Sequence, residues 1–287
     1  ISVFLPNSFL MINFDGKCFS SFKAVPEESL SCLTFLPIHT HHLIAFGGKI
    51  SLLESHYFSI MASLRRFRVE IPMHFTLDFF QEQTDLLNNF NKSTPDIQQL
   101  SLKFYRKKPP TQEEAVCPIC FLMQGNESTW ENKTLDLTLY KDHYVFASAY
   151  SNLFQTNASL RQLGQVFAYE NGFGAALLLN DHKRLVESTH GAVFLIQPDG
   201  IQTPALSEGT ANTVIRNAFI EFLKKESEIQ QFETEIAVFS IQQAEEVFLI
   251  SSAYGFLHIG QFRKKKLGKE KSVSLRLQFL DYLKNQL

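Results

Sequence analysis

The sequence carries almost no net charge of either sign, and this excludes several kinds of partner. Its 27 lysines and arginines nearly balance 29 acidic residues, which gives a formal net charge of -2 at pH 7. A chain of this kind supplies no field for nucleic acid or for an anionic membrane. The one basic run, residues 263–266, is expected to be a solvated edge after a strand. With 45% hydrophobic residues over 287 positions, the chain is long enough for one large or two ordinary globular domains.

Cysteine is scarce, with four residues at positions 18, 32, 117 and 120. Cys117 and Cys120 form a C-x-x-C pair, a pattern found in redox pairs and in half of a zinc site. The pair has neither a second C-x-x-C nor a nearby Cys/His pair, and it lies in the apolar run AVCPICFLM. We therefore expect apolar strand cysteines in a reducing compartment, no metal site and a cytoplasmic protein.

The sequence also lacks a secretory signal and the common signatures of a nucleophile. Residues 1–10, ISVFLPNSFL, have no basic region and are too short to span a bilayer. His39, His41 and His42 are clustered, but no acidic partner lies nearby, which favours a structural or surface role over a metal site. His190 is a conceivable general base, yet no G-x-S-x-G motif or cysteine with an orienting acid accompanies it.

The spacing of apolar residues predicts the secondary structure and its organisation. Helices are expected at 54–68, 76–90, 157–170, the later part of 206–225, and 274–285. Strands are expected at 10–14, 43–53, 100–105, 134–139, 175–180 and 192–203, with a hairpin through 180–183. Runs of strands with helices set apart are typical of an α+β protein. The polar segment 123–133 predicts a linker between a smaller domain at 1–122 and a larger one at 134–287.

Residues 177–216 carry the most distinctive pattern in the chain. They contain LLLN, a turn, L-V-E-S-T, an apolar strand, T-P-x-L-S-E-G and then V-x-R. This order resembles the fold type IV pyridoxal-phosphate enzymes of aminotransferase class IV, which include branched-chain and D-amino acid aminotransferases and aminodeoxychorismate lyase. Residues 47–72 and 244–266 resemble two further stretches of that family. Residues 11–17, MINFDGK, resemble its first strand, so the likeness starts at Met11 and residues 1–10 are expected to be a loosely held extension.

The resemblance implies a particular fold. It is a two-domain α+β fold like that of D-amino acid aminotransferase. The smaller N-terminal domain is α/β. The larger C-terminal domain is mixed and has a β-barrel-like core that carries the cofactor pocket.

The family's catalytic lysine has no counterpart here. In the family, a lysine in a K-T-x-N stretch binds the cofactor covalently. The ungapped interval to LLLN places Phe154 at that position, with Asn157 on the motif's asparagine. No lysine occurs between Lys141 and Lys183. A Schiff base requires a primary amine, which phenylalanine lacks, so we expect no covalent pyridoxal chemistry and no catalytic residue.

Two further groups of family residues are replaced. Ser59 stands where the family has an arginine that grips the cofactor phosphate, and Leu36 and Pro37 stand where it has Gly-Asp. These losses matter because a dianionic phosphate requires positive charge as well as hydrogen bonds.

Some positions of the cofactor site still match the family. Glu187 matches the acid that pairs with the pyridine nitrogen, and Ser252 matches a phosphate-facing serine or threonine. Val214 and Ile215 match residues whose backbone amides hold the phosphate, although Thr213 replaces the glycine that allows close approach. Without a pyridinium partner, a buried Glu187 must find other donors or stay protonated.

These residues together predict a pseudoenzyme of aminotransferase class IV. The resemblance implies a homodimer, and we expect no cofactor unless the family activity is retained, in which case pyridoxal phosphate binds. Two alternatives stay open. In one, the protein is an active aminotransferase or aminodeoxychorismate lyase that uses Lys141 or Lys183. In the other, it binds a small molecule in the vacated pocket, of which Phe154 fills a part.

Overall fold

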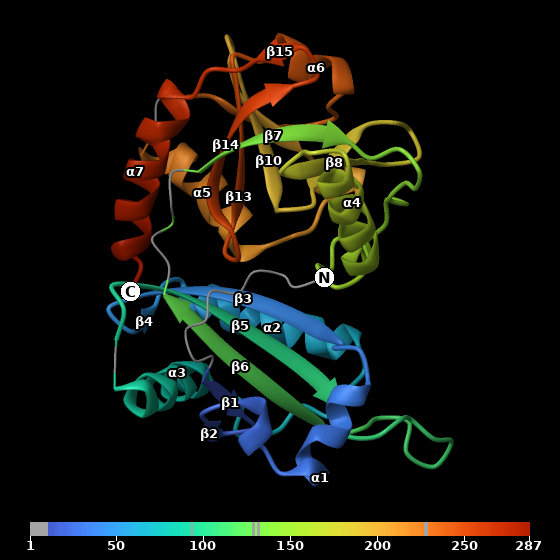
Figure 1. Cartoon of the computed structure of the whole chain (residues 1–287), viewed down its shortest axis with the longest axis vertical. Coiled ribbons are helices and arrows are strands. Elements are labelled where there is room, and N and C mark those ends of the chain that lie inside the picture. Colours follow the sequence, from blue (N-terminus) through green and yellow to red (C-terminus); the bar gives the residue numbers. More distant parts are fainter. Residues whose placement is uncertain (1–10, 93, 128–129, 131–132, 227–228) are drawn as a thin grey trace. The chain divides into compact units, whose positions relative to one another are not determined.

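The computed structural model describes residues 11–92, 94–127, 130, 133–226 and 229–287, and the expected extension at residues 1–10 lies outside this set. The chain divides into two compact units, residues 1–129 with 286–287 and residues 130–285 (Figure 1). Each unit has its own sheet and its own helices, so the fold is mixed α+β. Among the described residues, no helix combines the length and the apolar character that crossing a membrane requires.

The first unit is built on an antiparallel sheet. Its described strands have the order β2-β1-β6-β5-β3-β4. They are β1 (Ile12–Phe14), β2 (Lys17–Phe19), β3 (His39–Phe46), β4 (Lys49–Ile50), β5 (Ile97–Arg106) and β6 (Ile119–Glu127). The helical segments are η1 (Phe22–Ala24), α1 (Glu27–Leu30), η2 (Ser31–Thr34), α2 (Leu53–Arg66) and α3 (Leu77–Asn91).

Alternation along the strands gives this sheet two apolar faces. Leu100, Leu102 and Phe104 of β5 point to one face, where they pack with residues of α2 and α3 such as Leu64. Tyr105 of β5 points to the other face. There it packs with Ile12, Phe14, Val25, Cys32, Cys120 and Leu122, partly under the short helices between β2 and β3.

The second unit is built on a mixed, curled sheet. Its described strands have the order β12-β11-β10-β13-β14-β7-β8-β9, with β15 paired to β14. They are β7 (Lys133–Leu139), β8 (Ala175–Leu179), β9 (Leu185–Ser188), β10 (Ala192–Gln197), β11 (Gly200–Pro204), β12 (Gln231–Thr234), β13 (Glu246–Ser251), β14 (Gly255–Phe262) and β15 (Lys265–Lys266). The helical segments are α4 (Ala158–Glu170), η3 (Leu206–Glu208), α5 (Val214–Glu226), α6 (Val238–Gln243) and α7 (Glu270–Lys284).

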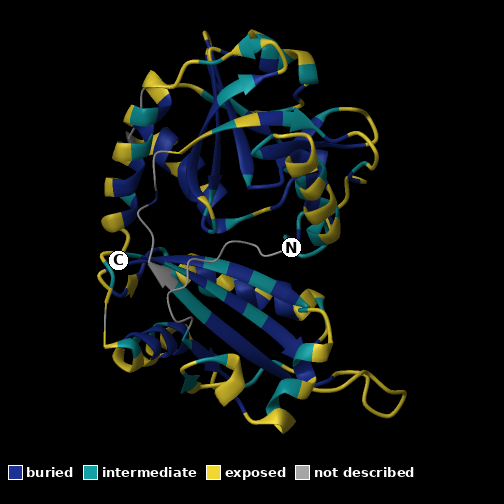
Figure 2. Ribbon diagram, in the orientation of Figure 1, coloured by how far each residue is buried: buried dark blue, intermediate teal, exposed yellow. Residues whose placement is uncertain are grey.

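Several phenylalanines pack together in the core between the curled sheet and its helices. Phe194, Phe248 and Phe256 stack across β10, β13 and β14. Phe219 of α5 meets all three rings edge-on, and Phe279 of α7 packs against Phe219. Figure 2 shows that most strands of this unit are buried along most of their length, whereas β7, β12 and β15 are largely intermediate or exposed. Exposed residues also lie on its helices. The sheet is therefore a rigid platform from which loops can hold side chains.

Most long elements lie where the spacing of apolar residues predicts them, and the differences are local. The predicted linker at 123–133 is wrong over Met123–Glu127, because these residues extend β6 and pair with β5. The strand predicted at 43–53 begins earlier, at His39, and the break predicted at Gly47 and Gly48 is the turn between β3 and β4. The last helix begins at Glu270 rather than at 274.

Candidate functional site

Phe154 lies in a compact turn just before α4. The turn is held by local backbone bonds, among them Leu153 N to Tyr150 O at 3.1 Å and Thr156 N to Leu153 O at 3.0 Å. Asn152 anchors it to the segment before α5, since its Nδ2 donates to Leu206 O and Thr210 O, both at 2.8 Å. The backbone around the half-buried Phe154 is thus fixed to the loop that leads to α5.

Glu187 lies on β9 and is almost completely buried, with 3% of its surface exposed. Arg161 of α4 reaches it, and the distance from Arg161 Nη1 to Glu187 Oε1 is 2.6 Å. The other carboxylate oxygen accepts a hydrogen bond from Ala211 N at 3.3 Å. Both oxygens therefore accept hydrogen bonds from the protein itself, which offsets the cost of burying the carboxyl group.

The same arginine binds Phe154 in two ways. Arg161 Nη2 donates a hydrogen bond to the backbone oxygen of Phe154. Its guanidinium carbon also lies 4.0 Å from the centre of the Phe154 ring, in the geometry of a cation–π contact. We call Phe154, Arg161 and Glu187 the plug cluster. It joins the residue predicted at the family's lysine position to the residue predicted at its acid position through one charged side chain.

Phe154 and Glu187 are candidates from the sequence, whereas Arg161, which contacts both, is not among them. A signal was present, because the buried face of α4 is formed by Arg161, Gly164 and Ala168, at the spacing of one helical face. A charged residue on such a face requires a buried partner. Gly164 lets α4 approach the sheet closely, since a Cβ there would lie 3.0 Å from Thr189 Cγ2 and 3.1 Å from Leu178 Cδ2.

Val214 and Ile215 form the start of α5 and are both buried. Thr213 caps this helix end, because its Oγ1 accepts a hydrogen bond from Arg216 N at 3.4 Å. The guanidinium of Arg216 is fully buried and binds elsewhere, with Nη2 at 2.8 Å from Pro204 O and 2.9 Å from Glu233 Oε2. This arginine is therefore engaged away from the helix start.

Ser252 is buried in the turn between β13 and β14. That turn meets the turn between β9 and β10, because the rings of Tyr254 and His190 have centres 4.1 Å apart. His190 Nδ1 lies 3.3 Å from Thr189 Oγ1, and burial lowers the pKa of His190 to about 4, with a further contribution from Lys133. His190 is therefore neutral near pH 7.

The two lysines considered as substitutes for Phe154 are both exposed. Lys141 follows β7, and Lys183 lies in the hairpin between β8 and β9 with a φ of 62°. In the first unit, Ser59 is half-buried on α2, and Leu36 is exposed in the segment before β3. Ser59 brings no positive charge to the position at which the family pattern predicts an arginine.

The clustered histidines take a structural role. His39 and His41 are buried on one face of β3, and His41 Nε2 lies 2.8 Å from His56 Nδ1 of α2. Within the described part of the chain, no group of three or more His, Cys, Asp or Glu side chains could hold a metal ion.

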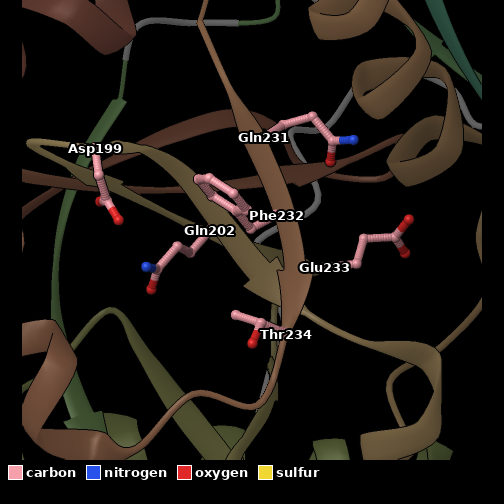
Figure 3. Close-up of a pocket in the computed structure, with 6 residues that line it drawn as sticks. All are labelled: Asp199, Gln202, Gln231, Phe232, Glu233 and Thr234. Carbon is pink, nitrogen blue, oxygen red and sulfur yellow. The ribbon is translucent and has the colours of Figure 1, made fainter.

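A shallow surface pocket lies over the strand pair β11 and β12 of the second unit (Figure 3). It is lined by Asp199, Gln202, Gln231, Phe232, Glu233 and Thr234. Its residues do not overlap with those predicted for the cofactor site, and Glu233 is already bound to Arg216. The pocket therefore does not correspond to the predicted cofactor site.

Comparison with known proteins places the chain in a family. The model of the amino-transferase class IV family matches residues 42–262, and the chain belongs to that family. A probable branched-chain-amino-acid aminotransferase of Aquifex aeolicus is 28% identical over 123 residues, which are 43% of this chain. The match spans 40% of the length of that relative.

Solved structures share the fold over nearly the whole chain. The branched-chain aminotransferase of Thermoproteus uzoniensis with norvaline has a TM-score of 0.82 at 14% identity, covering 96% of this chain and 95% of that one. The PLP form of the Thermobaculum terrenum enzyme has a TM-score of 0.81 at 16% identity, covering 96% and 94%. A putative 4-amino-4-deoxychorismate lyase of Legionella pneumophila has a TM-score of 0.77 at 17% identity, covering 91% and 97%. The two-domain α+β fold of class IV aminotransferases, predicted from the sequence, is thereby confirmed.

Proposed function

We propose that this protein is a pseudoenzyme of aminotransferase class IV that forms no covalent bond with pyridoxal phosphate. The observation that carries this proposal is the plug cluster. In it, the acid that matches the family's pyridine partner is bound by Arg161 at 2.6 Å. Arg161 is held at the same time by the ring and the backbone of Phe154. A guanidinium thus supplies the positive partner that the resemblance assigns to the cofactor ring.

The residues at this site do not fit a covalently held pyridoxal phosphate. Phe154 has no amine, and Lys141 and Lys183 are exposed. Admitting a pyridine ring at Glu187 would require removing Arg161 from a carboxylate that is 3% exposed. That step leaves a buried guanidinium without its partner, which is costly. These observations support loss of the covalent chemistry rather than a displaced lysine.

The family resemblance also indicates which role the protein would keep without catalysis. We propose that the protein is kept as a cytoplasmic homodimer that acts by binding rather than by catalysis. The burial of Glu187, Arg161 and Ser252 supports this proposal, because these side chains are packed within the chain itself.

The proposal is tested by titrating the purified protein with pyridoxal phosphate while recording its visible absorbance. Borohydride reduction and peptide mass analysis then locate any modified lysine. We expect no absorbance band of a bound Schiff base and no stoichiometric label on Lys141 or Lys183. A saturable band with one labelled lysine would contradict the proposal and restore the aminotransferase or lyase assignment.

A matched variant makes this test specific to the plug cluster. Arg161→Ala removes the guanidinium and leaves the Glu187 carboxylate free to pair with a pyridinium. We expect this variant to bind pyridoxal phosphate non-covalently, which is measured as quenching of the fluorescence of the added pyridoxal phosphate. Arg161→Lys keeps a cation at Glu187 and should bind pyridoxal phosphate as weakly as the native protein does. Equal binding by the native protein and by Arg161→Ala would show that Arg161 does not block the site.

A further inference from the structure

Two cysteines that are distant in the sequence lie against each other in the first unit. The Sγ atoms of Cys32 and Cys120 are 2.9 Å apart, and Cys120 donates its thiol hydrogen to Cys32. Both residues are buried, in the same apolar cluster as Tyr105 and Leu122. A disulfide bond has an S–S distance of about 2.05 Å, so the two sulfur atoms are less than about 1 Å from bonding distance.

The C-x-x-C pair that the sequence suggests is a poor alternative. Cys117 and Cys120 are three residues apart in nearly extended chain, because β6 begins at Ile119 and Pro118 forms an isolated bridge. Three extended residues span about 10 Å, whereas Cα atoms joined by a disulfide lie within about 7 Å. Alternation also puts them on opposite faces of the sheet, since Ile119 belongs to one apolar cluster and Cys120 to the other.

We infer that Cys32 and Cys120 form a thiol pair that a small-molecule disulfide oxidises to an intramolecular disulfide. A thiolate at Cys32 attacks one sulfur of the small disulfide, which releases one small thiol and leaves a mixed disulfide on Cys32. Cys120 then attacks the Cys32 sulfur and releases the second small thiol. The two protons of the protein thiols end on the two released thiols, and the small disulfide takes up the two electrons.

The hydrogen bond between the thiols sets the order of attack. Burial raises the pKa of both thiols, and donation to Cys32 raises the pKa of Cys120 further. The same bond lowers the pKa of Cys32, because it stabilises the thiolate that accepts it. Cys32 is therefore the first nucleophile and Cys120 the resolving thiol.

Access to the pair depends on the short helices that cover it. Cys32 lies in η2, and the three helical segments between β2 and β3 have only three or four residues each. Helices this short open locally more readily than the strands beneath them. Brief opening of this cover exposes Cys32, and its closure returns the sulfur to Cys120. Oxidation would then fasten the cover to β6 through a bond between residues 88 positions apart.

The inference is tested on the full chain by incubation with glutathione disulfide under native conditions. Free thiols are then blocked with N-ethylmaleimide, and peptides are mapped without reduction. We expect loss of two of the four thiols, no retained glutathione, and one cross-linked peptide pair that joins Cys32 to Cys120. A stable glutathione adduct on Cys32, a link between Cys117 and Cys120, or four unreacted thiols would each overturn the inference.

A matched pair of variants adds a second measurement. The Cys117→Ser variant keeps the proposed thiol pair. Oxidation should raise the melting temperature of this variant by about 5–10 °C, because the disulfide would close a long loop of the chain. Cys32→Ser should show no such shift. Equal shifts of the melting temperature in the two variants would contradict the assignment of the pair to Cys32 and Cys120. The peptide map of the native chain tests the inference even if a variant folds poorly. This outcome is independent of the proposed function, because the thiol pair and the plug cluster belong to different units.

Discussion

At the scale of single residues, the plug cluster gives a buried carboxylate a charged partner from the protein itself. A buried Glu187 without a donor would be costly. Arg161 supplies a donor, and it binds Glu187 Oε1 and the Phe154 backbone at once. The three residues therefore act as a unit, and their substitutions should not be additive.

The first prediction concerns the ion pair itself. Arg161→Ala should lower the free energy of unfolding by about 3–5 kcal/mol, because it leaves the Glu187 carboxylate buried without its main partner. The double variant Arg161→Leu with Glu187→Leu should lose less than Arg161→Ala, since no charge is then stranded. Urea denaturation followed by circular dichroism measures all three proteins.

Lys284→Ala supplies the surface control for this prediction. Lys284 is half-exposed and lies 4.0 Å from Asp281 near the end of α7. Its substitution should change the free energy of unfolding by no more than about 0.5 kcal/mol. A loss for Arg161→Ala as small as that of the control would mean that the plug cluster contributes little to the fold.

At the scale of secondary-structure elements, the turn between β9 and β10 holds Glu187 in place. Gly191 in this turn has a φ of 143°, and a Cβ there would lie 2.4 Å from the backbone oxygen of Ile250. Because a backbone atom cannot move aside as a side chain does, the turn requires glycine. This close approach holds the turn against β13.

Two glycine substitutions separate the effect of the close approach from that of backbone conformation. Gly191→Ala should lower the free energy of unfolding by at least about 2 kcal/mol, through strain together with the clash. Gly172 has a φ of 77°, but a Cβ added there would have no other atom within 4 Å. Gly172→Ala should therefore lower the free energy of unfolding only by the backbone cost of about 1–2 kcal/mol. Thermal and urea unfolding measure both variants. If Gly191→Ala and Gly172→Ala lost the same free energy of unfolding, the contact with Ile250 would have no effect.

The pairing of β3 with α2 makes the first unit sensitive to acid. Burial lowers the pKa of His39 to about 4 and of His56 to about 3, and it lowers the pKa of His41 well below its ordinary value. Neighbouring histidines lower the pKa values of His39 and His41 further. Both ring nitrogens of His39 are without a hydrogen-bond partner among the described residues, so a proton there gains no acceptor.

The sign of the pH dependence follows from these depressed pKa values. Below the unfolded pKa of about 6.5, the unfolded chain binds protons that the folded chain excludes. The free energy of unfolding should therefore be highest above pH 6.5 and fall between about pH 6.5 and 4, by up to about 1.4 kcal/mol per pH unit for each histidine. Urea unfolding at pH 7.5, 6, 5 and 4.5 measures this slope.

Two histidine variants check its source. His39→Phe removes one buried titrating ring and should flatten the slope, whereas His182→Asn, at an exposed position, should leave it unchanged. The prediction would be wrong if stability were constant down to pH 4.5, or if both variants behaved alike.

At the scale of the whole molecule, the sequence predicts the fold because the long elements carry regular apolar spacing. Both α3 and α4 lie within two residues of their predicted bounds, and the family pattern specifies the sheet of the second unit. The segment at 17–34 escaped prediction, because a two-strand hairpin and helices of three or four residues have no such periodicity. Residues 123–127 escaped it too, since a polar strand is sustained by its pairing with β5.

The candidate site was predictable only in part, for a physical reason. Phe154 and Glu187 are identified by position in a family pattern, and both lie in the plug cluster. Arg161 is not part of the quoted pattern. Its spacing with Gly164 and Ala168 indicates the face it shares, but its partner depends on the packing of α4 against β8, which sequence spacing does not give. The thiol pair of Cys32 and Cys120 was hidden in the same way, because 88 positions separate the two residues.

A crystal structure grown with millimolar pyridoxal phosphate tests the central claim most directly, because it shows which group faces Glu187. We expect the guanidinium of Arg161 to remain on the Glu187 carboxylate, at the 2.6 Å found here, with no pyridine ring between them. A pyridine nitrogen against Glu187, with Arg161 displaced from Phe154, would contradict the plug cluster and show that the site still accepts its family's cofactor.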